Sequence, residues 1–194
     1  MEIEKIHLPH RKWRMKRISK FIFNKILGWR VRGEFPVLSK CVIAVAPHTS
    51  NWDFPIAKLG YGSIGRTANF LIKAEWFIFP FNLFFKSLGG IPVTRDKNTS
   101  LTDTLAAEFD RHEQMQLAIT PEGTRKPTQE WKKGFYYIAF KAGIPILLVG
   151  LDYEKKEAIS LGLIHPSGDY EKDIEEIKSR YKGIQAKKPE NFLL

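Results

Sequence analysis

Apolar residues recur at helical spacing close to the amino terminus of the chain. Between Trp13 and Trp29 they return every three or four positions, which is the period of one face of an α-helix. This face comprises Met15, Ile18, Ile22, Ile26 and Trp29, with Phe21 and Leu27 beside it. Basic residues fill much of the remaining surface, namely Arg14, Lys16, Arg17, Lys20 and Lys25. The pattern predicts a basic amphipathic helix that ends near Gly28 or Gly33.

Short apolar runs alternate with helical patterns through the rest of the chain. Strands are expected at residues 41–46, 68–72, 90–94, 116–120, 145–151 and 158–164, and helices at residues 52–60, 75–87, 100–114, 130–142 and 170–182. Ser100 and Asp103 have the spacing of a capping box at the start of one helix. The alternation predicts a single α/β layered domain with a mixed or mostly parallel sheet flanked by helices.

Length and composition agree with one folded domain. The chain has 194 residues, of which 43% are hydrophobic and 27% charged. Its one cysteine, Cys41, lies inside an apolar run, which excludes a disulfide framework and a cysteine-rich metal site. We expect residues 1–40 to form an amino-terminal arm and residues 41–194 the domain.

The positive charge is concentrated in that arm. Residues 1–40 hold 11 Lys and Arg against 3 Asp and Glu, a net charge of +8, whereas residues 41–194 hold 20 against 18, a net charge of +2. A basic amphipathic helix suits the surface of an anionic membrane, where each nearby Lys or Arg contributes about 1 kcal/mol. An ordinary packing helix with a solvated basic face is the alternative. Nucleic acid is not expected as a partner, because no nucleic-acid motif follows.

No apolar run is long enough to span a bilayer, and the first 25 residues are too charged for a signal peptide. We therefore expect a peripheral protein on the cytoplasmic face of a membrane.

A candidate catalytic pair follows the first expected strand. His48 comes directly after residues 41–46, and Asp53 stands five residues later. That spacing separates the two side chains in a continuous helix or strand, so they can meet only across a strand-to-helix turn. Pro47 ends the strand, and Thr49, Ser50 and Asn51 are good helix-capping residues. A carboxylate beside the imidazole would leave its other nitrogen free to act as a general base.

Two further segments carry candidate ligand-binding residues at the ends of expected strands. The sequence Thr120-Pro121-Glu122-Gly123-Thr124-Arg125 follows the run Leu117–Ile119, and Leu88–Arg95 ends in another arginine. Loops at strand ends open into the ligand crevice of an α/β sheet. A glycine there lets the backbone approach a ligand, and an arginine offers a planar fork to phosphate oxygens.

The order of these motifs resembles that of the 1-acylglycerol-3-phosphate acyltransferase family. The family signature is His-x4-Asp, a Gly-rich strand ending in Arg, Pro-Glu-Gly-Thr-Arg, and an apolar strand containing Pro. The corresponding segments here are His48 with Asp53, Gly90–Arg95, Pro121–Arg125 and Ile144–Val149. Lys73, Glu75 and Lys133-Gly134 also look like family positions.

The resemblance implies a glycerolphosphate acyltransferase-like fold and transfer of an acyl chain to the free hydroxyl of a lysophospholipid. Acyl-CoA or an acyl-carrier protein would be the co-substrate, with no bound cofactor or metal. His48 would be the base and Asp53 its orienting partner. The substrate-binding residues would be Lys73, Arg95, Glu122, Gly123, Thr124 and Arg125.

Several alternatives stay open at this point. Pro47 and Lys126 depart from the residues common in the family, which leaves the acceptor open between 1-acylglycerol-3-phosphate and another lyso-lipid, such as a lyso-aminolipid. A thioesterase is disfavoured because no Gly-x-Ser-x-Gly elbow is present. A non-catalytic anionic-lipid binding protein would leave the His48 and Asp53 pair without a purpose. Residues 76–85 carry 6 of the 25 aromatic residues and predict an acyl-chain groove, a bilayer contact or a kinked core helix.

Overall fold

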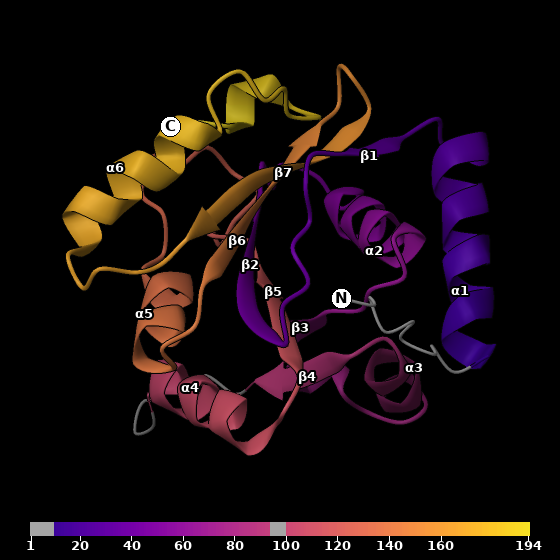
Figure 1. Ribbon diagram of the computed structural model, residues 1–194, viewed down its shortest axis with the longest axis horizontal. Coiled ribbons are helices and arrows are strands. Elements are labelled where there is room, and N and C mark those ends of the chain that lie inside the picture. The colour runs from indigo at the N-terminus through magenta and orange to yellow at the C-terminus, as the bar shows by residue number, and fades with distance from the viewer. Residues whose placement is uncertain (1–9, 94–99) are drawn as a thin grey trace, which may run out of the picture.

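The computed structural model describes residues 10–93 and 100–194, in which seven strands form one sheet in the order β1-β7-β6-β2-β5-β3-β4 (Figure 1). The strands are β1 (Arg30–Arg32), β2 (Lys40–Ala46), β3 (Asn69–Lys73), β4 (Gly90–Val93), β5 (Met115–Ile119), β6 (Ile146–Asp152) and β7 (Glu157–Ile164). Strands β6, β2, β5, β3 and β4 are parallel, and β7 runs antiparallel to β6 and parallel to β1. The carboxyl ends of the five parallel strands therefore share one edge, which we call the carboxyl edge.

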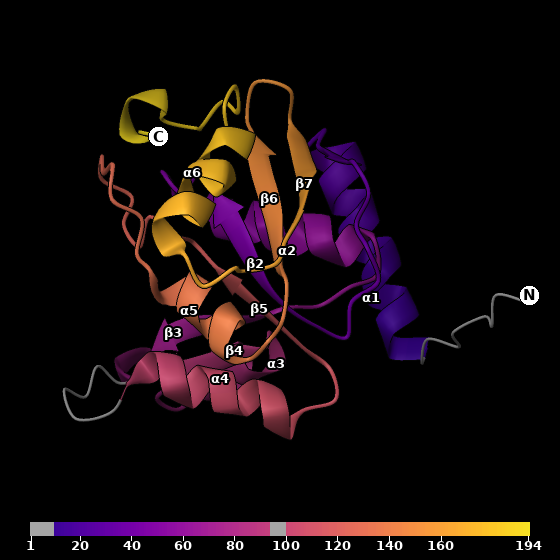
Figure 2. The same ribbon diagram turned by 60° about the vertical axis from the view of Figure 1, so that its left-hand side comes forward.

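Helices cover both faces of this sheet. They are α1 (His10–Phe21) with the π-helical turn η1 (Ile22–Ile26), α2 (Asp53–Ser63), α3 (Phe81–Ser87), α4 (Leu101–Arg111), α5 (Gly134–Lys141) and α6 (Tyr170–Arg180), with short 3-10 turns η2 (Ala74–Trp76) and η3 (Pro189–Asn191). Helices α1, α2 and α3 lie on one face, and α4, α5 and α6 on the other (Figures 1 and 2). The chain moves along the sheet in one direction from β2 through β3 to β4, and in the opposite direction from β4 through β5 to β6. Because each crossover is right-handed, the helices of the first three strands and those of the return lie on opposite faces.

Strand β2 divides the core into two halves. Its even-numbered residues, such as Val42 and Ala44, pack with Phe109, Phe135 and Ile177 beneath α4, α5 and α6. Its odd-numbered residues Cys41, Ile43 and Val45 pack with Phe23, Trp29 and Ile56 on the α2 side. A strand buried on both faces has no polar alternation, which explains the continuous apolar run at residues 41–46.

The amino-terminal helix packs on α2 through small residues. A Cβ atom at Gly60 would lie 3.1 Å from Cζ of Phe23, and one at Gly62 would lie 2.8 Å from Oγ of Ser19, so glycine permits this close approach. Three residues of the predicted apolar face, Met15, Ile18 and Ile26, are exposed, whereas Trp29 at its end is buried.

The chain is the predicted α/β domain with a mostly parallel sheet and an amino-terminal helix, as expected from the sequence. Two local predictions are wrong. Residues 75–87 form no single helix, because Pro80, which has no N–H to donate, separates η2 from α3. Strand β1 was not predicted, since three residues give too little periodicity. It pairs with β7 through main-chain contacts, so the sheet begins inside the segment that we assigned to the arm.

Candidate active site

The turn between β2 and α2 brings His48 and Asp53 together at the carboxyl edge. Nδ1 of His48 lies 3.2 Å from Oδ2 of Asp53. Within the described residues, Nδ1 is buried and has no other polar partner. The two side chains thus meet across a strand-to-helix turn, as their spacing predicts. The second ring nitrogen of His48 stays available for a ligand.

Four contacts fix the carboxylate of Asp53, which is 2% exposed. The main-chain N–H groups of Thr49 and Ser50 donate to Oδ2 at 2.8 and 2.7 Å, and the hydroxyl of Tyr153 donates to Oδ1 at 2.5 Å. Burial alone would raise the pKa of Asp53, but the hydrogen bonds to His48, Tyr153 and Ser50 outweigh it and hold the pKa below its ordinary value. Asp53 is thus a rigid, ionised partner for the imidazole.

Glu122 lies beside the turn that carries His48, with only 4% of its surface exposed. Its Oε1 accepts a hydrogen bond of 2.8 Å from the main-chain N–H of His48, and its Oε2 is buried without a partner among the described residues. Burial raises the pKa of Glu122 to about 7, against the opposing effect of its hydrogen bonds. The sequence predicts a substrate-binding role for Glu122. In the structure its side chain is not among those that line the pocket described below, and it holds the backbone of His48.

A pocket of about 520 Å³ opens beside the pair. It lies between α2 and the sheet, and His48, Lys73, Thr120 and Gly123 line it at the carboxyl edge. Most of its wall is apolar and includes Ile43, Val45, Phe54, Ala57, Phe70 and Val149. Size and lining are those of a site for a largely apolar ligand with a few polar groups that orient it.

The far part of this pocket contains polar side chains whose hydrogen bonds are satisfied. Tyr61 donates to Oε1 of Gln116 at 2.5 Å, and Arg66 donates to the carbonyls of Pro36 and Phe35 at 2.6 and 2.7 Å. Because these polar groups already have hydrogen-bond partners in the protein, they do not need a polar ligand at that end. The interior of the pocket therefore suits a hydrocarbon chain.

The loop after β5 carries three more of the predicted substrate-binding residues, and they differ in whether they line the pocket. Gly123 adopts a φ of +64° and lines the pocket, and a Cβ atom there would lie 2.9 Å from Cγ of Lys132. Arg125 is exposed on the same loop, and Thr124 accepts a hydrogen bond from the main-chain N–H of Lys126. Neither lines the pocket. Arg95 lies outside the described residues.

The family model for Acyltransferase matches residues 29–151, nearly two thirds of the chain. The chain belongs to the Acyltransferase family. Among solved structures, it is similar to the 1-acyl-sn-glycerophosphate (LPA) acyltransferase PlsC from Thermotoga maritima, with a TM-score of 0.64 and 20% identity over 88% of this chain and 76% of that one. At this identity the likeness shows a shared fold. No curated protein matches the chain.

The sequence of this acyltransferase did not predict a role for Tyr153, whose hydroxyl donates a hydrogen bond to Asp53. It stands directly after β6, a strand parallel to β2, and so reaches the same edge of the sheet as His48. Its ring also meets Trp29 edge-on, with the ring centroids 4.9 Å apart. Parallel strands end at one edge of a sheet, so the position directly after β6 is expected to reach the site in the same way as the loop after β5.

The carboxyl-terminal segment of the acyltransferase also borders the site. The main-chain N–H of Lys188 donates to Oγ1 of Thr49 at 3.2 Å, and Nζ of Lys187 lies 5.1 Å from the ring centroid of Trp52. Asn191 donates to the carbonyl of Arg125 at 3.1 Å. This segment ties the loop after β2 to the loop after β5. Residues 10–93 and 100–194 contain no group of His, Cys, Asp or Glu side chains placed to hold a metal ion.

Proposed function

We propose that this acyltransferase moves an acyl chain from acyl-CoA or an acyl-carrier protein to the free hydroxyl of a lysophospholipid, with 1-acylglycerol-3-phosphate as the preferred acceptor. The observation that carries the proposal is the His48 and Asp53 pair, which stands at the polar end of an apolar pocket. A hydroxyl needs a base, and an acyl chain needs a hydrocarbon environment. In this site the imidazole of His48 would serve as the base, and the apolar pocket would hold the acyl chain.

In this mechanism His48 removes the hydroxyl proton as the acceptor oxygen attacks the thioester carbonyl. The C–O bond forms, the C–S bond then breaks, and the departing sulfur takes the proton back from the imidazolium. The ionised carboxylate of Asp53 stabilises the imidazolium while it exists. Because a thioester is already activated, this sequence requires no covalent intermediate.

The pocket between α2 and the sheet would hold an acyl chain, with the ester or thioester group near His48. Lys73 lines the same end of the pocket and would approach the phosphate of the acceptor. Arg125 would reach it from the neighbouring loop.

Removal of Arg125 tests this assignment. Arg125→Ala is expected to raise the KM for 1-acylglycerol-3-phosphate about 10-fold or more, since a hydrogen bond to a charged group contributes about 1.5–3 kcal/mol. Arg125→Lys should restore binding only partly, because the planar fork is lost. The KM for the thioester should change little. Lys126→Ala is the matched control, as it removes an exposed cation from the next position. A selective rise in the thioester KM would assign Arg125 to the donor.

Tyr153 gives a second test, because it touches Asp53 and would act only through it. Tyr153→Phe removes the donor to Oδ1 and keeps the ring. Asp53 then loses one of the hydrogen bonds that hold its carboxylate in place and keep its pKa low, so the imidazole is oriented less well and kcat should be about 10-fold lower, with little change in the KM for the acceptor. Tyr170→Phe is the control, since it removes a hydroxyl that donates to a carbonyl in the other half of the core. An unchanged kcat, or a fall in kcat matched by Tyr170→Phe, would show that Tyr153 contributes only packing.

The basic arm supports action at a membrane surface. Helix α1 leaves Met15, Ile18 and Phe21 exposed beside Lys20 and Lys25. None of the helices within the described residues is long and apolar enough to cross a bilayer. From the exposed apolar and basic side chains of α1 and η1 we propose peripheral binding to anionic lipid, on the cytoplasmic face.

An acceptor panel tests the proposed function. Purified protein would receive acyl-CoA or acyl-carrier protein with lyso-lipids that differ only in their headgroup. The proposal predicts the highest kcat/KM for 1-acylglycerol-3-phosphate. A preference for a lyso-aminolipid would retain the chemistry and change the acceptor. No diacyl product with any acceptor would favour a lipid-binding protein without this activity.

A further inference from the structure

Exposed apolar side chains are distributed unevenly over the two faces of the sheet. The described part of the chain has sixteen large apolar side chains that are exposed, and eleven belong to α1, α2, α3 or residues that adjoin them. Among the described residues of α4, α5 and α6, the exposed ones are Leu101, which lines the pocket at the start of α4, and Phe140 on the opposite side. Isolated exposed apolar residues are ordinary on protein surfaces, whereas a concentration on one side marks an interaction surface.

Five of the eleven lie in one short segment, residues 78–84, which we call the aromatic segment. Their exposed fractions range from 57% to 78%, and they are Ile78, Phe79, Phe81, Leu83 and Phe84. The segment follows β3 and η2, so it begins near the carboxyl edge, where His48 also lies. Lys73, which ends β3, lines the pocket. The segment therefore adjoins the site through a few residues of chain.

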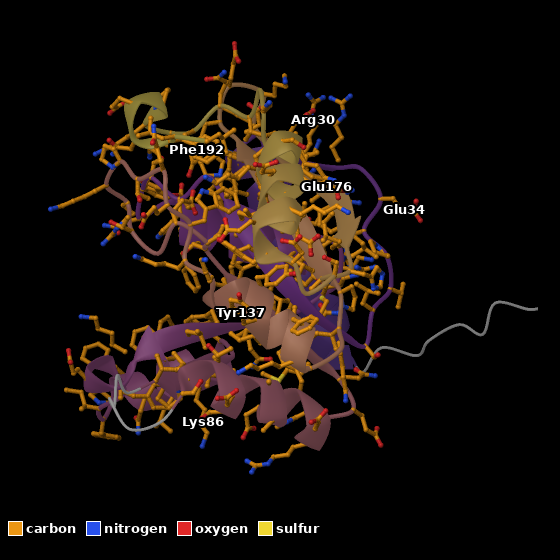
Figure 3. All side chains as sticks on the ribbon, turned by 90° about the vertical axis from the view of Figure 1, so that its left-hand side faces the viewer. Arg30, Glu34, Lys86, Tyr137, Glu176 and Phe192 are labelled. Atoms are coloured by element: carbon orange, nitrogen blue, oxygen red, sulfur yellow. The ribbon has the colours of Figure 1, made fainter. Side chains whose placement is uncertain are left out.

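Charge is divided between the same two sides. The helices on the α2 side, α1 with η1, α2 and α3, carry nine Lys and Arg and one acidic residue, the buried Asp53. Helices α4, α5 and α6 carry five Lys and Arg against seven Asp and Glu. Figure 3 looks onto this second side, where Glu176 of α6 and Tyr137 of α5 are labelled. Around the aromatic segment, Lys73 and Lys86 are exposed, with Glu75 the one acidic residue between them.

We propose that the aromatic segment inserts into the headgroup region of an anionic leaflet and, together with α1, orients the protein with its α2 side toward the membrane. A bilayer is the occupant that fits both properties, since apolar rings with basic neighbours bind an interface of hydrocarbon and anionic headgroups. The acidic residues of α4 and α6 then face away from the negative surface.

This orientation deepens the proposed function and rests on it, because a lipid acceptor gives the contact its purpose. The carboxyl edge then lies beside the leaflet, and a lysophospholipid passes from the bilayer to His48 without crossing water with its acyl chain exposed. An acyl chain in water carries a free-energy cost of about 0.8 kcal/mol for each CH₂ group, so a direct entry route favours binding.

A single fluorescent label tests the orientation directly. The native thiol, Cys41, is fully buried, and burial raises its pKa to about 12, so it stays protonated and unreactive. Phe79→Cys and Phe140→Cys therefore each accept one environment-sensitive label, on opposite sides of the molecule. With vesicles of phosphatidylglycerol and phosphatidylcholine, the label at residue 79 should brighten several-fold and be quenched by nitroxide-bearing lipid. The label at residue 140 should not change. Equal responses at both positions, or a response at residue 140 alone, would overturn the proposed orientation.

Removal of the rings tests whether the aromatic segment contributes to binding. The double variant Phe79→Ser with Phe84→Ser should bind these vesicles at least about 10-fold more weakly, since burial of one Phe side chain is sufficient for a factor of that size. Phe140→Ser, the matched control on the other side, should bind as the wild type does. Wild-type binding by the double variant would refute the proposal. So would a dimer in solution that the double variant dissociates, because the occupant would then be a second copy of the chain.

These readouts are independent of catalysis. If the protein binds vesicles as predicted but transfers no acyl chain, the proposed function fails and the orientation stands. If the double variant acylates a monomeric, short-chain acceptor normally but binds vesicles normally as well, the orientation fails and the proposed function stands.

Discussion

Replacement of His48 by alanine is expected to lower kcat by at least about 100-fold, the usual scale for loss of a general base. The imidazole is partly exposed and lines the pocket, where it contacts Asp53 at 3.2 Å, so the fold should survive its removal. Asp53→Asn should also lower kcat strongly, because an amide in that place cannot stabilise the imidazolium by charge. The KM for the acceptor should change little in either variant, since neither residue is assigned to the phosphate.

His112 supplies the control for this experiment. It also lies near a carboxylate, with Nδ1 3.8 Å from Oε2 of Glu108, but it is exposed at the end of α4. His112→Ala should retain wild-type turnover. If purified His48→Ala protein formed product at the wild-type rate, with the same melting temperature, His48 would not be the base.

Glu122 should make the stability of the protein depend on pH. Its pKa is about 7 in the folded protein, where burial is the main cause, against an ordinary value of 4.5. Between these two values the unfolded chain loses the proton while the folded protein keeps it, so the free energy of unfolding falls as the pH rises. The decrease should be on the order of 3 kcal/mol, since one pKa unit corresponds to about 1.4 kcal/mol.

Urea unfolding of wild type and Glu122→Gln at pH 5 and pH 8 would measure this effect. Glutamine can still accept the hydrogen bond from the main chain of His48 but does not ionise. The variant should therefore lose less stability between the two pH values than the wild type does. The exposed residue Glu130 provides a control, because Glu130→Gln should keep the wild-type dependence. Equal slopes for the wild type and Glu122→Gln would show that the buried carboxyl does not titrate in this range.

The parts of the site that sequence predicted are local. The His48 and Asp53 contact follows from the turn chemistry of six consecutive residues, and β2 follows from an apolar run too continuous for a half-exposed strand. Both features are set by neighbours in the chain. The position of Gly123 at the pocket likewise follows from a loop that comes directly after a strand.

The parts that sequence missed depend on contacts between distant residues. Tyr153 meets Asp53 from 100 positions away, and Glu122 meets the backbone of His48 from 74 positions away. Which side chains meet at the carboxyl edge depends on strand order, which periodicity does not give. The role of the aromatic segment could not be predicted for another reason. Its sequence pattern is equally compatible with a core helix, an acyl-chain groove and a membrane interface. Only its exposure in the structure favours the interface.

The most direct test of the central claim is the fate of a labelled acyl chain. Purified protein would be mixed with acyl-CoA labelled in the acyl chain and with 1-acylglycerol-3-phosphate, and labelled diacyl lipid and labelled free fatty acid would be counted by mass spectrometry. Transfer through the His48 and Asp53 pair predicts that most of the label appears in diacyl lipid, with both products at background for His48→Ala. Label in free fatty acid alone would identify a hydrolase, and diacyl lipid from His48→Ala at the wild-type rate would exclude the pair as the catalytic base.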